Sequence, residues 1–217
     1  MQSDEPRGVT AALNRGSEPP ETTDLSAAVG DALRRARAAS GLSMRALAKL
    51  ADVSQPFLSQ VEHGTATPSL YTLYRIAHAL GIPPTELMPG VSSPREVQVL
   101  RAGEGARLPV SEVPGAASGR LLSAGAGVGL EVVEYRVQPD QDLGGWFESS
   151  GEQTLYVADG ALEVTLEGHG TWELNAGDSI SHPSDIRHRW RALGPTESRV
   201  VLSVAHTGAR PNNAIAT

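Results

Sequence analysis

The fold of the N-terminal half is decided by residues 33–81, LRRARAASGLSMRALAKLADVSQPFLSQVEHGTATPSLYTLYRIAHALG. Apolar side chains recur in this stretch at spacings of three and four residues, as at Leu47, Leu50 and Ala51. This spacing predicts amphipathic helices, since it places apolar groups on one helix face. The runs are short because a glycine, the residue best suited to end a helix, follows each of three runs, at Gly41, Gly64 and Gly81.

The helix starts carry signals of their own. Ser43 precedes MRALAKLA and Ser54 precedes QPFLSQVE, so each serine is expected to cap the helix that follows. Thr67 is the expected cap before PSLYTLYRIAHAL, with Pro68 in the first turn, where its missing N–H costs nothing. With a short last helix at PPTELM, these signals predict five helices within residues 27–89.

Beyond a Pro/Gly/Ser connector the periodicity changes to two. Three alternating runs predict short strands with inward apolar side chains, and Gly-rich turns separate the runs. We therefore expect a multidomain α + β protein whose C-terminal part, residues 97–207, is an antiparallel β-barrel or jelly roll. Residues 1–26 are expected to form a disordered leader, 90–96 a linker and 208–217 a flexible tail. Leu162, Val164 and Leu166 alternate with polar residues in one run, Leu130, Val132 and Tyr135 lie near a second run, and Val200, Leu202 and Val204 lie in a third.

Charge is distributed unevenly along the chain, whose formal net charge is −7. Residues 27–88 carry 6 basic and 4 acidic side chains (6 − 4 = +2), residues 1–26 carry 2 and 5 (2 − 5 = −3), and residues 89–217 carry 10 and 16 (10 − 16 = −6). An anionic partner is therefore expected at the helical block. The absence of cysteine excludes disulfides and thiolate metal sites. Because no apolar run approaches the ~20 residues that span a bilayer, we expect a cytoplasmic protein without membrane contact.

The segment Ser54–Glu62 has the polarity that a DNA-reading helix requires. Leu58 and Val61 face inward, which leaves Gln55, Ser59 and Gln60 outward. A glutamine can pair bidentately with adenine in the major groove, which accommodates an α-helix. The alternative from the residues alone is an ordinary solvated helix face, since Gln and Ser are common on such faces.

Residues 33–81 resemble the helix-turn-helix of the XRE/Cro-like phage-repressor family almost from end to end. The matching elements include GLS, ALA, VSQ, LSQVEHG, PSL and IAHALG. The resemblance implies a lambda-repressor-like DNA-binding domain, with Arg37 and Glu62 as a structural pair between the first and third helices. Met44 departs from the family, which usually has a phosphate-contacting Gln there; Arg45 is a candidate replacement. The DNA-binding positions expected from the resemblance and from the helix starts are Ser43, Arg45, Ser54, Gln55, Pro56, Ser59 and Gln60.

Residues 96–206 are similar to the two-motif core of the cupin superfamily, most clearly in GGWFESSGEQTLYVADGALEVTLEGHGTWELNAGDSISHPSDIRHRW. Metal-binding members of that superfamily supply two His and a Glu from the first motif and a His from the second. The resemblance places Phe147 and Ser149 at the two His positions and Gln153 at the Glu position, and retains His188. A neutral amide and a hydroxyl are poor ligands for a transition metal, so we expect no metal, no other cofactor and no catalytic residue.

The inward positions of the β-domain predict a pocket for a small organic ligand, with an interior packed solid by side chains as the alternative. His182 is expected to be a packing or surface residue. The resemblances together imply a regulator that binds a pseudo-palindromic operator in double-stranded DNA as a homodimer and answers to a small-molecule effector. The competing interpretation is a cupin metalloenzyme, since a hydroxypropylphosphonate epoxidase family shares this domain arrangement but requires iron ligands. The expected pocket residues are Phe147, Ser149, Gln153, His188 and Trp190.

Overall fold

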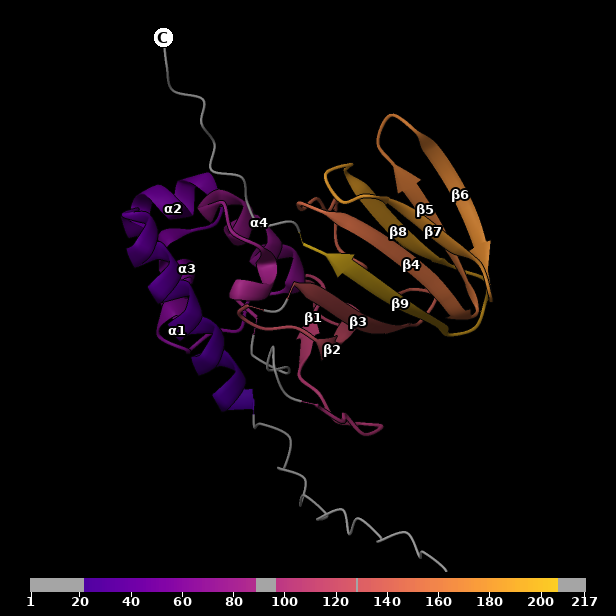
Figure 1. The fold of residues 1–217 in the computed structure, drawn as a ribbon, viewed down its shortest axis with the longest axis horizontal. Coiled ribbons are helices and arrows are strands. Elements are labelled where there is room, and N and C mark those ends of the chain that lie inside the picture. Colours follow the sequence, from indigo (N-terminus) through magenta and orange to yellow (C-terminus); the bar gives the residue numbers. More distant parts are fainter. Residues whose placement is uncertain (1–21, 89–96, 128, 207–217) are drawn as a thin grey trace, which may run out of the picture.

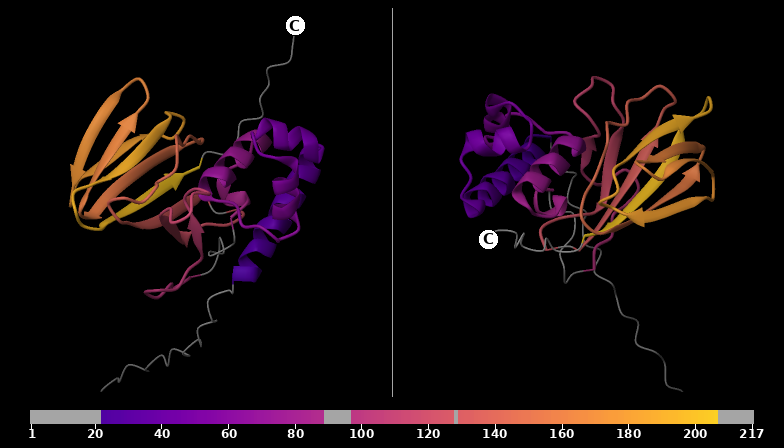
Figure 2. Two further views of the ribbon diagram at one scale, coloured as in Figure 1. Left: turned by 180° about the vertical axis from the view of Figure 1, so that it is seen from behind. Right: turned by 90° about the horizontal axis from the view of Figure 1, so that it is seen from above.

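The computed structural model describes residues 22–88, 97–127 and 129–206. Helices lie on one side of the molecule and β-sheets on the other, as all the ribbon views show (Figures 1 and 2). Within the described residues the helices are α1 (Thr22–Ser40), α2 (Met44–Leu50), α3 (Gln55–Glu62), α4 (Leu70–Leu80) and the 3₁₀-helix η1 (Pro84–Glu86). The strands there are β1 (Arg107–Pro109), β2 (Ser118–Ser123), β3 (Leu130–Val137), β4 (Glu152–Asp159), β5 (Ala161–Leu166), β6 (Gly170–Asn175), β7 (Ser179–Pro183), β8 (His188–Leu193) and β9 (Ser198–Ala205).

Most of the predicted helix boundaries are confirmed. The hydroxyls of Ser43 and Ser54 accept hydrogen bonds from backbone N–H groups three residues further on. The three terminating glycines have left-handed φ values of 69°, 69° and 67°. The expected cap at Thr67 is wrong, because Ser69 caps α4 through Thr72 N–H, while the Thr67 hydroxyl contacts that of Ser26. The expected fifth helix is only the single 3₁₀ turn η1.

The helical core extends further toward the N-terminus than expected. Helix α1 begins at Thr22, before the expected domain start at residue 27, and Leu25 packs into the core with 7% of its surface exposed. The burial of Leu25 explains the earlier start, since a helix is stabilised mainly by packing of its apolar face. The remainder of the expected leader, the linker and the flexible tail lie outside the described residues.

The β-domain consists of two antiparallel sheets. One has six strands in the order β1-β2-β3-β9-β4-β7, and the other has three in the order β6-β5-β8. An isolated bridge between Phe147 and His188 connects the loop before β4 to β8. In the described part of the chain the strands thus form two facing sheets with a shared apolar interior, rather than one hydrogen-bonded ring.

The alternating apolar residues are buried in β5 and β9, whereas in β3 Tyr135 is buried and Leu130 and Val132 lie on the other face. Leu130 is 47% exposed, and the buried residues of β3 that face the inner residues of β9 are Glu131, Val133 and Tyr135. The reason is a carboxylate at an inward position, which hides the alternation when only apolar residues are counted. Glu131 therefore lies fully buried inside the β-domain.

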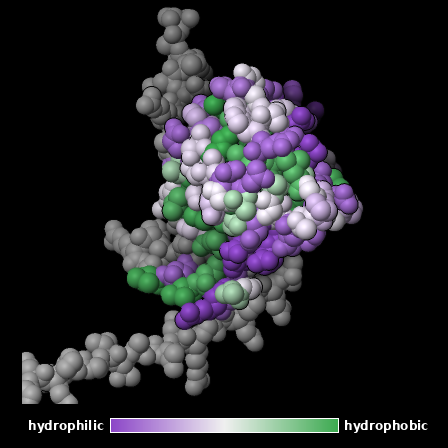
Figure 3. Space-filling model, turned by 90° about the vertical axis from the view of Figure 1, so that its right-hand side faces the viewer, coloured by the Kyte–Doolittle hydropathy of each residue, from purple (hydrophilic) through white to green (hydrophobic). Residues whose placement is uncertain are grey.

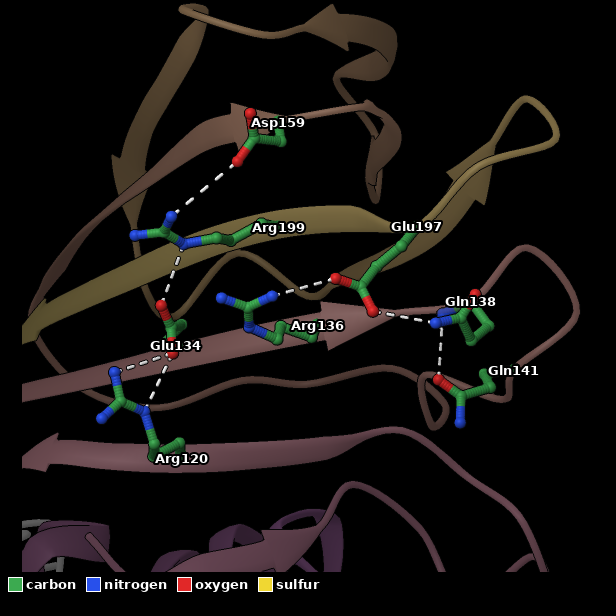
Figure 4. A network of polar contacts seen from close by, with 8 residues as sticks. All are labelled: Arg120, Glu134, Arg136, Gln138, Gln141, Asp159, Glu197 and Arg199. Carbon is green, nitrogen blue, oxygen red and sulfur yellow. Dashed lines mark hydrogen bonds and ion pairs between the residues drawn. The ribbon is translucent and has the colours of Figure 1, made fainter. Parts of the chain in front are cut away.

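A polar network joins the strands on the outer face of the large sheet (Figure 4). The Glu134 carboxylate accepts hydrogen bonds from Arg120 at 2.9 Å and from Arg199 at 3.0 Å. Burial alone raises the pKa of Glu134, but these two guanidinium groups outweigh burial and hold it below its usual value. The network therefore ties β2, β3 and β9 together through one carboxylate.

Helix α4 joins the two domains. Glu112, from the loop after β1, accepts hydrogen bonds from the N-cap hydroxyl of Ser69 at 2.7 Å and from the Thr72 hydroxyl. Leu70 packs directly on β2 at Gly119, where a Cβ atom would lie 2.8 Å from the Leu70 Cδ1 atom. A side chain at residue 119 would therefore push α4 away from the sheet.

The side of the β-domain remote from the helices mixes hydrophilic and hydrophobic residues (Figure 3). Trp172 of β6 is among the large apolar side chains of the protein that remain exposed, at 40%. No helix in the ranges described above is long and apolar enough to cross a membrane.

Candidate functional site

Helix α3 presents a polar face to solvent. Gln55, Pro56 and Gln60 are exposed and Ser59 is half-buried, whereas Leu58 and Val61 are fully buried on the opposite side. The eight residues of α3 thus place two amide side chains, with donors and acceptors available, on the surface remote from the core.

Close packing and an ion pair hold α3 against α1. The Arg37 guanidinium donates to both oxygens of Glu62, at 2.6 and 2.9 Å, and the Glu62 residue is only 5% exposed. The hydrogen bond to Glu62 is the main reason that the pKa of Arg37 is raised. At Gly30 of α1 a Cβ atom would lie 2.4 Å from the Val61 carbonyl oxygen, so the two helices touch through backbone. The position of α3 is therefore well defined.

The turn between α2 and α3 has a support that sequence reasoning missed. Asp52 has a left-handed φ of 50°, and its carboxylate pairs with Arg75 of α4 at 2.6 Å. Arg45 of α2 is exposed, and Met44 is half-buried and packs against the core instead of facing solvent. No local sequence signal connects residues 52 and 75, because their contact depends on how α4 crosses α2.

Inside the β-domain, a single amide lies between two imidazoles. The Gln153 Nε2 atom lies 2.9 Å from His182 Nε2 and 3.1 Å from His188 Nε2. The Nδ1 atoms of the histidines lie 2.8 and 2.9 Å from the backbone carbonyls of Pro183 and Ile186. Each imidazole therefore donates from Nδ1 and accepts from the amide at Nε2.

Both imidazoles are held neutral. Burial lowers the pKa of His188 to about 4, and burial also lowers the pKa of His182. Neutral imidazoles suit the hydrogen bonds that Gln153 donates, since an imidazolium has no lone pair left to accept one. His182, expected to be a packing or surface residue, thus belongs to the same cluster as His188 because β7 pairs with β4 in a register that puts it opposite Gln153.

The residues around this cluster do not fit the metal site of metal-binding cupins. Phe147 offers a ring, and the buried Ser149 Oγ atom has no hydrogen-bond partner within the described residues. The same ranges contain no group of three or more His, Cys, Asp or Glu side chains that could hold a metal ion. The Gln153 amide nitrogen lies between the two Nε2 atoms, and an amide lacks the charge that a carboxylate contributes to a metal.

Within the described residues, the interior of the β-domain holds a small cavity. It measures about 10 Å³ and lies beside Phe147, Gln153, His188 and Trp190, and Ser149 does not line it. The indole N–H of Trp190 is buried without a hydrogen-bond partner in the described structure. A larger cavity of about 230 Å³ lies between the domains, lined by α4, the α2–α3 turn, the loop before β4 and Arg187.

Comparisons with known proteins agree with this arrangement. The helix-turn-helix family model matches residues 33–87, and the cupin domain model matches residues 133–204. The chain is 35% identical, over 30% of its own length and 84% of the relative, to the uncharacterized HTH-type transcriptional regulator y4dJ of Sinorhizobium fredii. It is 24% identical to the HTH-type transcriptional regulator PuuR of Escherichia coli over 185 residues, which are 85% of this chain and 97% of PuuR.

A solved structure shows the same fold. The HTH_3 family transcriptional regulator from Vibrio cholerae matches with a TM-score of 0.58 at 22% identity, over 85% of this chain and 98% of that chain. The chain spans 49% and 64% of the length of two other curated relatives, each 32% identical to it. From its recognition helix, its two matched domains and these relatives, the chain belongs to the XRE-type helix-turn-helix family of transcriptional regulators and carries a C-terminal cupin domain.

Proposed function

We propose that this regulator reads a specific operator in double-stranded DNA as a homodimer and that its cupin domain responds to a small organic effector. The observation that carries the DNA-binding part is the outward face of α3, on which Gln55 and Gln60 are exposed while Leu58 and Val61 anchor the helix. The proposal assigns base reading to the two glutamines, since an amide pairs bidentately with adenine.

Phosphate contacts are assigned to the residues around the helix starts. Ser43 and Ser54 use their oxygens as acceptors within the caps, so their hydroxyl hydrogens can still be donated to a phosphate. Arg45 is exposed beside them and adds a positive charge. Ser59 and Pro56 are assigned to contacts at the groove wall on the same side of α3.

A homodimer follows from the size of the DNA-reading surface. One short helix reaches only a few base pairs, and helix-turn-helix proteins usually bind two half-sites about one DNA turn apart. We expect light scattering at micromolar concentration to give twice the mass of 22.7 kDa. A monomeric mass at that concentration would contradict this part of the proposal.

The effector part rests on the interior of the β-domain. Phe147, Gln153, His188 and Trp190 surround its small cavity, and the indole N–H of Trp190 is a buried donor without a partner in the described ranges. Buried donors are usually satisfied, so an unsatisfied one beside a cavity favours a ligand with a hydrogen-bond acceptor. The hydroxyl of Ser149, in the loop before β4, is a second buried polar group that is unpaired among the described residues.

The test is a gel shift of a labelled fragment from the gene's upstream region, with excess competitor DNA. We expect Gln55→Ala and Gln60→Ala each to reduce the preference for the operator over competitor about tenfold, with salt-sensitive nonspecific binding nearly unchanged. Gln98→Ala is the matched control, since this exposed glutamine lies outside the helical domain. Unchanged selectivity in both α3 variants would remove base reading from these residues.

The same sample distinguishes the regulator from a metalloenzyme. A specific shift by protein that contains no iron supports the regulator. Stoichiometric iron without a shift would overturn the proposal and favour the enzyme.

A further inference from the structure

A tyrosine of the helical domain lines the small cavity inside the β-domain. Tyr74 is on α4, yet it is only 9% exposed and lines the small inner cavity together with Phe147, Tyr135 and Trp190. Its ring meets the Phe147 ring edge-to-face, with centroids 5.8 Å apart and an interplanar angle of 89°. The ring of Tyr74 therefore occupies an aromatic subsite built by the other domain.

The hydroxyl of Tyr74 donates a hydrogen bond to a buried carboxylate. It donates to Glu131 Oε1 at 2.8 Å, and the other carboxylate oxygen lies 2.7 Å from His206 Nε2. Glu131 is fully buried on the inner face of β3. A buried carboxylate left without donors is strongly unfavourable, so this position requires a hydroxyl or another donor.

Tyr74 and Phe147 also form the wall between two cavities. Both residues line the inner cavity of about 10 Å³ and the cavity of about 230 Å³ between the domains. A molecule in the larger cavity thus lies against the two rings that cover the interior. The inner cavity is too small for an organic ligand, so a ligand there has to take space that a lining side chain such as Tyr74 now occupies.

We infer that the cupin domain takes a phenol as its effector. The phenol binds at the place where the ring of Tyr74, from α4, now lies, so the phenol and Tyr74 exclude each other. The ligand class follows from the present contacts of Tyr74: an aromatic ring against Phe147, beside a cavity that Tyr135 and Trp190 also line, with a hydroxyl that donates to Glu131. This inference rests on the proposed effector role of the same domain.

Displacement of Tyr74 links the ligand to the DNA-binding domain. Tyr74 is on the same helix as Arg75, which holds the turn before α3 through Asp52. A phenol that removes the Tyr74–Glu131 hydrogen bond weakens the docking of α4 on β3, and so frees the recognition helix to change its position. A ligand shifts such an equilibrium only by its preference for one state, and competition with Tyr74 provides that preference.

The test measures binding of 4-methylphenol, the side-chain compound of tyrosine, to the full chain by calorimetry. Tyr74→Ala empties the subsite, and we expect it to bind 4-methylphenol at least about 100-fold more tightly than the wild type, which must first expel its own ring. Tyr74→Phe keeps the ring but not the bond to Glu131, so we expect a gain of about tenfold. Tyr71→Ala is the matched control, because Tyr71 lines the cavity between the domains but not the inner one.

Toluene tests the role of the hydroxyl. We expect the Tyr74→Ala protein to prefer 4-methylphenol over toluene about tenfold, and the added change Glu131→Gln to reduce that preference. Equal affinity of wild type, Tyr74→Phe and Tyr74→Ala for 4-methylphenol would overturn the inference, as would equal affinity of Tyr74→Ala for the two compounds. If Tyr74→Ala does not fold, the inference is tested by the affinity of Tyr74→Phe for 4-methylphenol, compared with that of the wild type.

A separate measurement addresses the proposed function. Operator affinity is measured with and without saturating 4-methylphenol. If 4-methylphenol competes with Tyr74 but operator affinity is unchanged, the phenol site is supported and the effector role is refuted. If the protein does not bind the operator at all, the proposed DNA-binding function is refuted.

Discussion

The recognition helix and the interior of the β-domain differ in how they hold their polar groups. On α3, Gln55 and Gln60 extend into solvent, while the structure is carried by the buried face. In the β-domain, Gln153 is buried and donates to two imidazoles. The same side chain is therefore available to bind DNA in one region and is part of the packing in the other.

This difference concerns energy as well as exposure. An exposed amide exchanges hydrogen bonds with water at little cost, so its replacement affects binding more than folding. A buried amide with two partners cannot be removed without leaving those partners unsatisfied. Four predictions test this contrast between buried and exposed polar groups, and they are given in order of decreasing effect.

Arg37→Ala should have the largest effect, a loss of about 3 kcal/mol in the free energy of unfolding, because it leaves the buried Glu62 carboxylate unpaired. Urea unfolding followed by helical circular dichroism measures it. Arg34→Ala is the control: Arg34 pairs with Asp31 on the surface of α1, and we expect a loss below about 0.5 kcal/mol. Equal losses would show that the buried pair does not position α3.

Gln153→Glu should convert the packed cluster into a site with two imidazoles and a carboxylate. Because the amide nitrogen lies between both His Nε2 atoms, a carboxylate there supplies the missing charge, and we expect Co²⁺ affinity to rise roughly 100-fold over the wild type. Visible absorption of bound Co²⁺ measures it. Gln153→Leu, of similar size but without a ligand atom, is the control, and the same affinity in both variants would contradict the prediction.

Acidification should destabilise the β-domain through its histidines. The pKa of His188 is lowered to about 4, so the unfolded chain, with an ordinary pKa of about 6.5, takes up the proton first. Stability is therefore lost as the pH falls below about 6.5, and we expect His188 to account for about 2 kcal/mol between about pH 7.5 and about pH 5. Unfolding at several pH values measures it.

His188→Gln should remove most of this pH dependence, and His78→Gln, at an exposed position on α4, should leave it unchanged. Glu112 and Glu134, whose pKa values are lowered, add to the loss of stability only toward the acidic end of this window, where the unfolded chain begins to protonate its carboxylates. If the free energy of unfolding of His188→Gln changes with pH as steeply as that of the wild type, the buried imidazole of His188 is not the cause of the pH dependence.

Gln60→Ala should have the smallest effect on folding, within about 0.5 kcal/mol, although the proposed function expects it to reduce operator selectivity. The side chain is exposed, so its loss leaves no cavity and no buried partner. Urea unfolding measures the change. A loss of more than about 1 kcal/mol would show that Gln60 takes part in packing and is not free for DNA.

Helix ends could be predicted from the sequence where interactions between residues three or four positions apart determine them. The serine caps at Ser43 and Ser54 and the three terminating glycines depend on residues three or four positions apart, and these predictions are confirmed. Prediction was wrong at Thr67, where a contact with Ser26 replaces the local pattern. In β3 it held only at Tyr135, because the buried face carries the carboxylate of Glu131, while Leu130 and Val132 lie on the other face.

The candidate site could be predicted only in part. Exposure of Gln55 and Gln60 follows from helical periodicity, since two apolar residues on one face fix the direction of the other. The contact of Tyr74 with Glu131 joins residues 57 positions apart, so no local sequence pattern predicts it.

The amino-acid sequence was sufficient for the two domains, for the short helices with their caps and for the outward face of α3, because periodicity and capping act over a few residues. Only the tertiary structure decided that His182 joins His188 at Gln153, that Arg75 supports the turn before α3 and that Tyr74 enters the β-domain. The physical reason is that these contacts depend on strand register and on how α4 packs between the domains, and both are set by long-range packing.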